Sequence, residues 1–412
     1  MHIVHVTHRA WPVAGGSEQY LHEIARRQVA AGHRVTVVAT QAQALSALWS
    51  ANAVRVPAAT PDEHDGIRIL RLPLRYLPVG ELTFAALRRI TWLFSHMAVP
   101  LVLPLVRFFP RVPALPETLD AIQADLYFAW NLTLEGLTAA VARQSARQHI
   151  PWIAVPLLHL ARPAFYTMPH QLHLLRDAAR ILTQTSTERE FLLARGFEPR
   201  RVVVVSPGVA ATPPSDEAHH PVPYKSDDVP LVVTIGALGY DKGTLHLLGA
   251  ARRLWKWGIP LELALVGTME PAVERAIARL PEQWRGRCHC LGRVSEAEKW
   301  ALLAAADVLA LPSRTESFGI VFLEAWLCRK PVIGARAGAV PDVVQHSVDG
   351  LLVEFGDVVG LADALRVLLT DPARAVLLGE HGYQKVQQRY TWDYQYARLQ
   401  EIMAQVRMEW RK

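Results

Sequence analysis

The stretch PLVVTIGALGYDKGTLHLLGAARRLWKWGIPLELALVG, residues 230–267, decides the fold of the second half of the chain. Two apolar runs, 230–236 and 261–267, each end in a glycine and have the length of buried strands. An amphipathic segment at 244–257 lies between them and predicts a helix. Strand, glycine loop, helix and strand in this order form a βαβ unit, in which the two strands are parallel.

The same alternation continues toward the C-terminus. Two more apolar runs, 307–312 and 331–334, flank a segment that predicts a helix from about residue 318. Together with the unit at 230–267, these elements predict a doubly wound α/β domain.

The first half of the chain opens with the same pattern. A strand at 3–7 is followed by a loop with Gly15 and Gly16, a helix from about 18 to 31 and a strand at 34–40. We therefore predict an α/β protein with two Rossmann-like, doubly wound domains. The proline-rich, polar stretch 211–223 is the predicted boundary between them.

The composition is that of a globular protein with sizeable cores. Of the 412 residues, 51% are hydrophobic and 20% are charged, which argues against a disordered chain. The three cysteines, Cys288, Cys290 and Cys328, are too few for a disulfide framework and suit a reducing compartment. The first residues lack the basic and apolar regions of a signal peptide, so we expect a cytoplasmic enzyme.

The net charge of +6 is unevenly distributed along the chain. Residues 1–205 contain 21 arginines, no lysine and 14 acidic residues, so all of the excess positive charge lies in this half. An acidic partner, a membrane surface or nucleic acid would explain the asymmetry, and so would a general preference for arginine. No basic patch interleaved with aromatic residues supports nucleic-acid binding, so we expect no nucleic-acid partner.

The sequence PSRTESFGIVFLEA, residues 312–325, carries the chemistry. The segment places a short polar loop between an apolar strand and an apolar helix. Amides in the first turn of a helix have no intrahelical acceptor and can bind an anion. Two carboxylates, Glu316 and Glu324, lie eight positions apart, which is about 12 Å along a helix axis. That distance suits the two ends of a nucleotide sugar whose diphosphate lies over the helix start.

With the glycine loop at Gly15 and Gly16 and the Lys242-Gly243 turn, this Glu-x7-Glu pattern resembles the retaining family-four glycosyltransferases of the GT-B fold. The resemblance covers nearly the whole chain. It implies two Rossmann-like domains that face each other across a cleft. Residues 1–208 would bind the acceptor and 209–390 the nucleotide-sugar donor, and a C-terminal helix at 391–412 would pack back on the first domain.

The resemblance also implies roles for individual residues. Glu324 would hold the ribose hydroxyls of the donor, and Glu316 would bind the transferred sugar near its reacting carbon. Lys242 would pair with the diphosphate, and His159 would point at the sugar from the cleft. The remaining donor contacts would come from the amides of the motif, from the two glycines of the first loop and from the segment beside the nucleobase: Ser317, Phe318, Gly319, Ile320, Gly15, Gly16, Arg293 and Val294.

Two positions depart from the family pattern. An arginine usually stands five residues before the lysine, and here that position is Ala237. Arg9, Arg293 or Arg314 could replace the missing phosphate contact. The family's Asn-Gly-Val-Asp turn is Pro-Gly-Val-Ala at 207–210, a change that we expect to be architectural.

The implied reaction is transfer of a sugar from a nucleoside diphosphate to an acceptor hydroxyl, with retention at the anomeric carbon. It needs no cofactor and no metal, because Lys242 and a helix terminus can neutralise the diphosphate. The product would belong to a glycan, a glycolipid or a polysaccharide. Two alternatives remain: a nucleotide-sugar epimerase, and a nucleotide-sugar-binding homologue with little turnover, which Ala237 would favour.

The segment 84–113 is the least ordinary part of the first half. Its apolar run is interrupted by Pro100 and Pro104 and is short for a bilayer span, and it has basic residues at both ends. It suits a peripheral contact with the inner face of a membrane. The alternative, which is the preferred interpretation, is an apolar helix packed on the first sheet.

A second segment resembles a metal site. Residues Cys288, His289 and Cys290 form this segment, but there is no fourth ligand and no paired Cys-x-x-Cys. We expect a buried strand there.

Overall fold

The computed structural model describes residues 1–412 except 14, 79, 161–165, 214–220, 226–227 and 411–412. It divides into two compact units, Met1–Val205 with Tyr396–Lys412 and Ser206–Gln395. Most of the proline-rich stretch expected between two domains, 214–220, lies outside the described residues.

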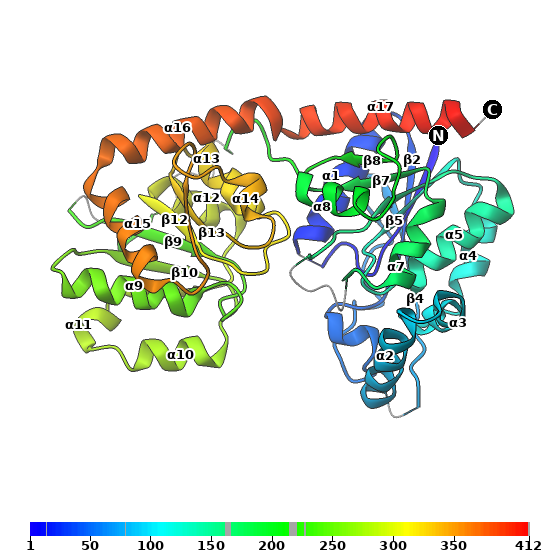
Figure 1. Cartoon of the computed structure of the whole chain (residues 1–412), viewed down its shortest axis with the longest axis horizontal. Helices are drawn as coiled ribbons and strands as arrows, with labels where there is room; N and C mark the ends of the chain where they lie inside the picture. Colours follow the sequence, from blue (N-terminus) through cyan, green and yellow to red (C-terminus); the bar gives the residue numbers. More distant parts are fainter. Residues whose placement is uncertain (14, 79, 161–165, 214–220, 226–227, 411–412) are drawn as a thin grey trace. The chain divides into compact units, whose positions relative to one another are not determined.

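The first unit is built on a sheet of eight strands in the order β3-β4-β2-β1-β5-β6-β7-β8 (Figure 1). All neighbouring strands are parallel except β3 and β4. The strands are β1 His2–Val6, β2 Arg34–Thr40, β3 Glu63–His64, β4 Ile67–Leu72, β5 Leu126–Trp130, β6 Trp152–Val155, β7 Arg180–Thr183 and β8 Val202–Val204.

Helices cover this sheet, and α2 and α3 lie along one border of the unit (Figure 1). They are α1 Gly16–Ala30, α2 Glu81–Ser95, α3 Val99–Val102, α4 Leu115–Ala121, α5 Gly136–Gln148, α7 Pro169–Leu174 and α8 Ser186–Leu193, with short 3-10 turns at Leu45–Leu48, Leu103–Phe108 and Leu175–Asp177. The last helix, α17 Trp392–Trp410, places its residues from Tyr396 onward in this unit. Arg180 of β7 pairs with Glu409 at 2.7 Å, and Trp410 Nε1 donates to the His149 carbonyl.

The second unit is built on six parallel strands in the order β11-β10-β9-β12-β13-β14. The strands are β9 Leu231–Ile235, β10 Glu262–Val266, β11 Cys288–Gly292, β12 Val308–Leu311, β13 Val332–Ala335 and β14 Leu351–Val353. The helices are α9 Thr244–Lys256, α10 Pro271–Ala278, α11 Glu282–Arg285, α12 Glu296–Ala305, α13 Ile320–Leu327, α14 Val340–Val343, α15 Val358–Thr370 and α16 Pro372–Arg389.

Apolar residues cover both faces of the second sheet. Within β9, Val232 belongs to the cluster on one face, and Leu231 and Val233 belong to the cluster on the other. A strand buried on both faces is continuously apolar, which is why the run at 230–236 shows no alternation. The structure thus confirms the prediction of two parallel-sheet α/β domains.

The strand order reverses once in each sheet. In the first unit the chain leaves β1 toward β2 on one side and later fills β5 to β8 on the other. In the second unit the same reversal separates β9 from β12. Loops that follow the strands at such a point diverge to opposite faces and leave a crevice at the carboxyl edge of the sheet, where ligands bind.

Candidate active site

Two loops meet at the point of strand reversal in the second unit. The loop after β9 carries Lys242, and the loop after β12 carries Glu316. Lys242 Nζ lies 2.5 Å from Glu316 Oε2, and both side chains are largely shielded from solvent. The structure therefore brings together two residues that are 74 positions apart in the sequence.

Glycine makes this approach possible. Gly243 has a φ of +71°, and a Cβ there would lie 2.2 Å from the carbonyl oxygen of Pro312. The amide of Arg314 donates to the Asp241 carbonyl at 2.8 Å, which joins the two loops by backbone as well. Any residue with a side chain at 243 would push the loops apart, because both the backbone angle and the space require glycine.

The start of α13 follows directly from Glu316. Gly319 has a φ of +84° and is the N-cap of the helix, so α13 begins at Ile320 and not near 318. The amide of Ala339 donates to the Glu316 carbonyl at 3.0 Å, and a Cβ at Gly338 would lie 2.6 Å from the same oxygen. The backbone around Glu316 is thus held from the loop after β13. Of the predicted amide donors, Phe318 and Gly319 are buried, and Ser317 and Ile320 are half-buried.

Glu324 lies one turn into α13 and is only 6% exposed. Its Oε1 accepts from Lys299 Nζ at 2.8 Å, and the same ammonium lies 2.7 Å from Glu296 Oε2. Burial raises the pKa of Glu324 above its ordinary value, and Lys299 offsets this only in part. Burial alone would lower the pKa of Lys299, but Glu324 and Glu296 raise it. Among the described residues, Lys299 is the cation that pairs with this buried carboxylate.

Sequence reasoning missed Lys299. Its spacing from Glu296 is that of an ordinary surface ion pair on one helix. The sequence pattern does not indicate that α12 packs on α13. The packing of α12 on α13 decides that its ammonium also reaches Glu324.

Arg293 and Val294 follow β11 directly. Arg293 is exposed and lines a hollow of about 510 Å³ at the carboxyl ends of β10 and β11, together with Gly267, Met269 and Glu274. A Cβ at Gly267, whose φ is +127°, would lie 1.8 Å from the Gly236 carbonyl oxygen. The backbones of Gly236 and Gly267 therefore pack directly against each other beside this hollow. Val294 is half-buried beside this hollow.

Of the candidate replacements for the arginine missing at Ala237, Arg314 contacts the residue next to Lys242. Its guanidinium lies 2.5 Å from Asp241, the residue next to Lys242. The guanidinium also lies over the rings of Tyr240 and Phe355, 5.3 and 5.5 Å from their centroids. Arg9 is engaged in the first unit, where it pairs with the buried Glu18 at 2.7 Å.

The predicted residues of the first unit lie after β1 and β6. Gly15 is the N-cap of α1, and a Cβ there would lie 2.3 Å from Glu18 Oε2, whereas Gly16 has open space around its Cα. His159 follows β6, and its ring lies 4.5 Å from that of Tyr166. All three are at the carboxyl edge of the first sheet.

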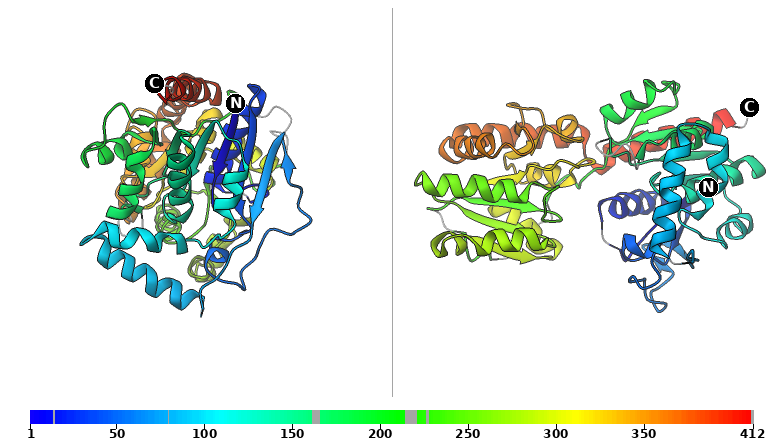
Figure 2. Two further views of the ribbon diagram at one scale, coloured as in Figure 1. Left: turned by 90° about the vertical axis from the view of Figure 1, so that its right-hand side faces the viewer. Right: turned by 60° about the horizontal axis from the view of Figure 1, so that its bottom comes forward.

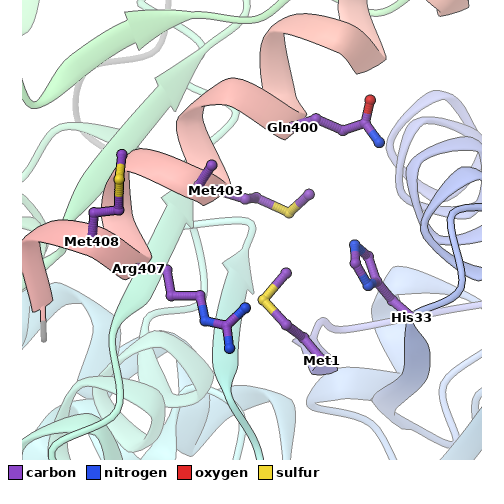
Figure 3. Close-up of a pocket in the computed structure, with 7 residues that line it drawn as sticks. Met1, His33, Gln400, Met403, Arg407 and Met408 are labelled. Carbon is purple, nitrogen blue, oxygen red and sulfur yellow. The ribbon is translucent and has the colours of Figure 1, made fainter.

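A second hollow lies in the first unit, at the opposite edge of its sheet. It measures about 460 Å³, and Met403 and Arg407 of α17 face Met1 and His33 across it (Figure 3). Met1 and His33 precede β1 and β2, so this hollow lies at the amino ends of parallel strands. Ligands of doubly wound sheets bind at the carboxyl ends, so we do not assign the donor to it.

The structure bears out the preferred interpretation of segment 84–113 only in its second half, where Val102, Val106, Phe109 and Val112 are buried. Helix α2 does not pack its apolar side chains on the first sheet, because most of them face solvent. Its buried residues are the polar Thr91 and Ser95. Only Phe84 and Leu87 contact a small apolar cluster around Phe109. The α2–α3 segment lies along one border of the unit (Figure 2).

The strand predicted at Cys288, His289 and Cys290 is β11, but it is an edge strand and is only partly buried. His289 Nε2 lies 2.8 Å from Glu262 Oε2. Among the described residues, these cysteines belong to no group that could hold a metal ion.

Lys299 gives a test of the electrostatics of this site. We expect Lys299→Met to lower the free energy of unfolding by about 3 kcal/mol, because it leaves a buried carboxylate without its partner. The pKa of Glu324 should rise further in the variant. A group whose pKa is raised by folding costs stability as pH rises through that pKa, so the loss should be larger at pH 8 than at pH 5.

Chemical denaturation at both pH values measures this effect. Glu296→Ala is the matched control, because it removes the exposed partner of the same lysine and should cost less than about 1 kcal/mol. Equal losses in the two variants, or a loss in Lys299→Met that does not depend on pH, would contradict the assignment.

Two family models match this chain, one in each unit. A model described as "Glycosyl transferase 4-like domain" matches residues 15–208, and one described as "Glycosyl transferases group 1" matches 215–385. Together they cover most of the sequence.

Curated relatives match the chain over different lengths. The alpha-maltose-1-phosphate synthase of Mycobacterium tuberculosis is 33% identical over 175 residues, which is 40% of this chain and 45% of that protein. The chain thus spans less than half the length of this relative. A GDP-mannose-dependent alpha-(1-6)-phosphatidylinositol monomannoside mannosyltransferase of M. tuberculosis is 29% identical over 97% of each chain.

Solved structures share the whole fold. The complex of Anabaena HepE with UDP and glucose superposes with a TM-score of 0.73 at 19% identity, over 98% of this chain and 100% of that one. The sucrose-phosphate synthase of Thermosynechococcus elongatus superposes with a TM-score of 0.72 at 22% identity, over 98% of each chain. With the two family models and the geometry of the second unit, these matches show that the chain belongs to the family-four-like glycosyltransferases of the GT-B fold.

Proposed function

We propose that this protein transfers a sugar from a nucleoside diphosphate to an acceptor hydroxyl, with retention of configuration. The observation that carries the proposal is the Lys242–Glu316 ion pair between the loops after β9 and β12, with Glu324 buried one turn into α13, the helix that follows the second loop. A cation beside two carboxylates offers complementary groups to a diphosphate and to hydroxyl pairs.

Each of these groups has one task in the proposed reaction. The Lys242 ammonium binds the diphosphate and stabilises the charge that develops on it as the bond to the sugar breaks. Glu316 accepts hydrogen bonds from the sugar hydroxyls while the first amides of α13 face the phosphate. Before the donor arrives, the 2.5 Å ion pair holds both side chains between the two loops, so their ordering is already largely complete.

Glu324 binds the ribose of the donor in this proposal. Its carboxylate has two oxygens, and Lys299 contacts Oε1, which leaves Oε2 for a hydroxyl. The hollow beside Arg293 lies at the same edge of the sheet and would take the nucleobase. The mannosyltransferase relative is named for GDP-mannose, and HepE was solved with UDP, so both bases belong in the test.

The proposed reaction needs no metal ion, since the Lys242 charge and the start of α13 act on the phosphates. Transfer in the presence of excess chelator, measured well below the melting temperature, should match transfer without it. Loss of turnover that Mg²⁺ or Mn²⁺ restores would overturn this point.

The residues after β1 and β6 of the first unit are the proposed contacts of the sugar and acceptor. Gly16 has open space around its Cα, so backbone can approach a ligand there, and His159 supplies a polar ring. A lipid-linked or carbohydrate acceptor is proposed, in keeping with the phosphatidylinositol monomannoside in the relative's name.

We further propose that the protein contacts an anionic membrane surface through α2 and α3. The outward face of this segment carries Leu82, Leu93, Met97 and Leu101, which are 73%, 55%, 75% and 70% exposed, along with Trp92 and Phe94. Arg89 of α2 and Arg107, which lies just after α3, are exposed, and Glu81 is the only acidic residue from 81 to 113. An apolar face flanked by cations suits an interfacial helix.

The inward face of α2 explains how such a surface can remain exposed. Arg88 donates to both oxygens of the fully buried Glu135, at 2.7 and 2.8 Å, and to the Thr133 carbonyl at 2.7 Å. His170 Nε2 lies 2.7 Å from the same carboxylate. Burial alone would raise the pKa of Glu135, but Arg88 and His170 lower it. The helix is therefore fixed to the unit by charge, and its apolar residues are left outside.

No helix in the part of the chain that the structure describes is long and apolar enough to cross a bilayer. The contact that we propose is peripheral, on the inner face of the membrane.

Donor binding is the first test of the proposed function. We expect thermal-shift and calorimetric titrations to show binding of GDP or UDP, and Glu324→Ala to weaken it about 10- to 100-fold through loss of a charged hydrogen bond. Glu296→Ala removes a nearby carboxylate that the proposal leaves unused and should bind normally. Unchanged affinity in Glu324→Ala would refute the ribose assignment.

Product analysis then separates the alternatives. A transferase forms a glycosylated acceptor, an epimerase changes the donor sugar without an acceptor product, and a binding protein does neither. Lys242→Ala should lower kcat about 10²- to 10³-fold if the ammonium stabilises the leaving phosphate.

Membrane contact is tested by sedimentation with phosphatidylglycerol vesicles and, as a neutral comparison, phosphatidylcholine vesicles. We expect binding to the anionic vesicles at low salt, weaker binding as salt rises, and none for Leu93→Glu/Met97→Glu. Val376→Glu, at a residue that is 68% exposed in α16, is the matched control and should bind. Equal binding of the control and the double variant would contradict the proposal.

A further inference from the structure

Three potential metal ligands meet at the edge of the first sheet, apart from every residue proposed above for the reaction. His22 lies on α1, and His64 and Asp65 lie at the turn between β3 and β4. His22 Nε2 is 2.9 Å and His64 Nε2 is 3.8 Å from Asp65 Oδ2. One ligand atom from each of the three residues lies within 4.8 Å of the others.

The backbone of the turn aims Asp65 at the two histidines. The strands β3 and β4 pair His64 with Ile67, so only Asp65 and Gly66 form the turn. Both have positive φ values, +50° and +71°, as a tight two-residue hairpin turn requires. The turn places the Asp65 carboxylate next to His22, whose Nε2 lies 2.9 Å from its Oδ2.

Aromatic contacts fix the imidazoles. The two histidine rings are stacked, with centroids 5.2 Å apart. His64 also stacks on the indole of Trp11, at 4.0 Å and an interplanar angle of 14°. Arg71 donates to the Trp11 carbonyl at 2.9 Å and so anchors that residue to β4. The three ligands come from two segments, α1 and the β3–β4 hairpin, and stacking orients the imidazoles before any ion binds.

We propose that His22, His64 and Asp65 bind one divalent transition-metal ion of the zinc type, with water in the remaining position. Two imidazoles and one carboxylate are ligands that Zn²⁺ prefers, and tetrahedral ligands at about 2.0–2.1 Å from zinc lie about 3.3 Å from one another. The distances of 2.9 and 3.8 Å bracket that separation, so small side-chain shifts complete the site.

The ion would act on structure and would take no part in sugar transfer. It would join α1 to the edge hairpin β3–β4. Through the stack of His64 on Trp11, it would also restrain the loop from β1 to α1, which carries Gly15 and Gly16. This inference does not depend on the proposed function, because its ligands and its test are separate from donor binding.

The test is a zinc titration of the full chain after chelator treatment, followed by competition with a chromophoric chelator. We expect one saturable equivalent of Zn²⁺ and a rise in melting temperature. His64→Ala, His22→Gln and Asp65→Asn should each weaken binding at least tenfold. Asparagine tolerates a positive φ, so Asp65→Asn removes the charge without straining the turn.

His173→Ala is the matched control, because His173 is an exposed histidine of α7 that lies outside the cluster. It should bind zinc as the unchanged protein does. Absence of saturable binding, or wild-type affinity in His64→Ala, would overturn the proposal.

Hydrogen exchange gives a readout that nonspecific binding to other histidines would not reproduce. Zn²⁺ should slow exchange of amides in the β1–α1 loop and in the β3–β4 hairpin and leave the second unit unchanged. In Asp65→Asn, Zn²⁺ should no longer slow exchange of the hairpin amides. Protection that persists in that variant would place the ion elsewhere and refute the site.

Discussion

The arrangement of the candidate active site depends on one close approach, that of Gly243 to Pro312. The loops after β9 and β12 start on neighbouring parallel strands and lead to helices, so they would separate unless something held them together. A residue without a side chain, in left-handed backbone, lets one loop lie directly against the carbonyl of the other. Lys242 and Glu316 stand on either side of this contact, and their ion pair follows from it.

The two carboxylates of the motif are in different electrostatic environments. Glu316 lies in the loop and shares its charge with Lys242, which would also meet the phosphates. Glu324 is buried on α13, and burial raises its pKa. The ion pair with Lys299 fixes the position of its carboxylate. A buried carboxylate that is already desolvated forms a stronger hydrogen bond with a ligand hydroxyl than a solvated carboxylate does, because the buried carboxylate need not first lose bound water.

The first unit uses a buried charge for a different purpose. In an ordinary surface helix the apolar residues face the core and the polar ones face water. In α2 the arrangement is largely reversed, since Arg88, Thr91 and Ser95 face inward and Leu82 and Leu93 face outward. Glu135 makes this possible because both of its carboxylate oxygens accept from Arg88 Nη1. This gives α2 a specific polar anchor beside the small apolar contact of Phe84 and Leu87.

The sequence by itself determined the fold class and the residues of the motif. Buried parallel strands are continuously apolar, and the glycines and helices between them follow in regular order, so 3–40 and 230–334 could be interpreted without coordinates. The pattern at 312–325 likewise identified Glu316 and Glu324, because a polar loop between an apolar strand and an apolar helix is a local feature.

Tertiary structure alone decided which residues these side chains contact. Lys299, the anchor at Glu135, the outward face of α2 and the cluster of His22, His64 and Asp65 all join segments that are far apart in the chain. Periodicity reports that a helix has an apolar face, but which neighbour or solvent that face meets depends on how the elements pack.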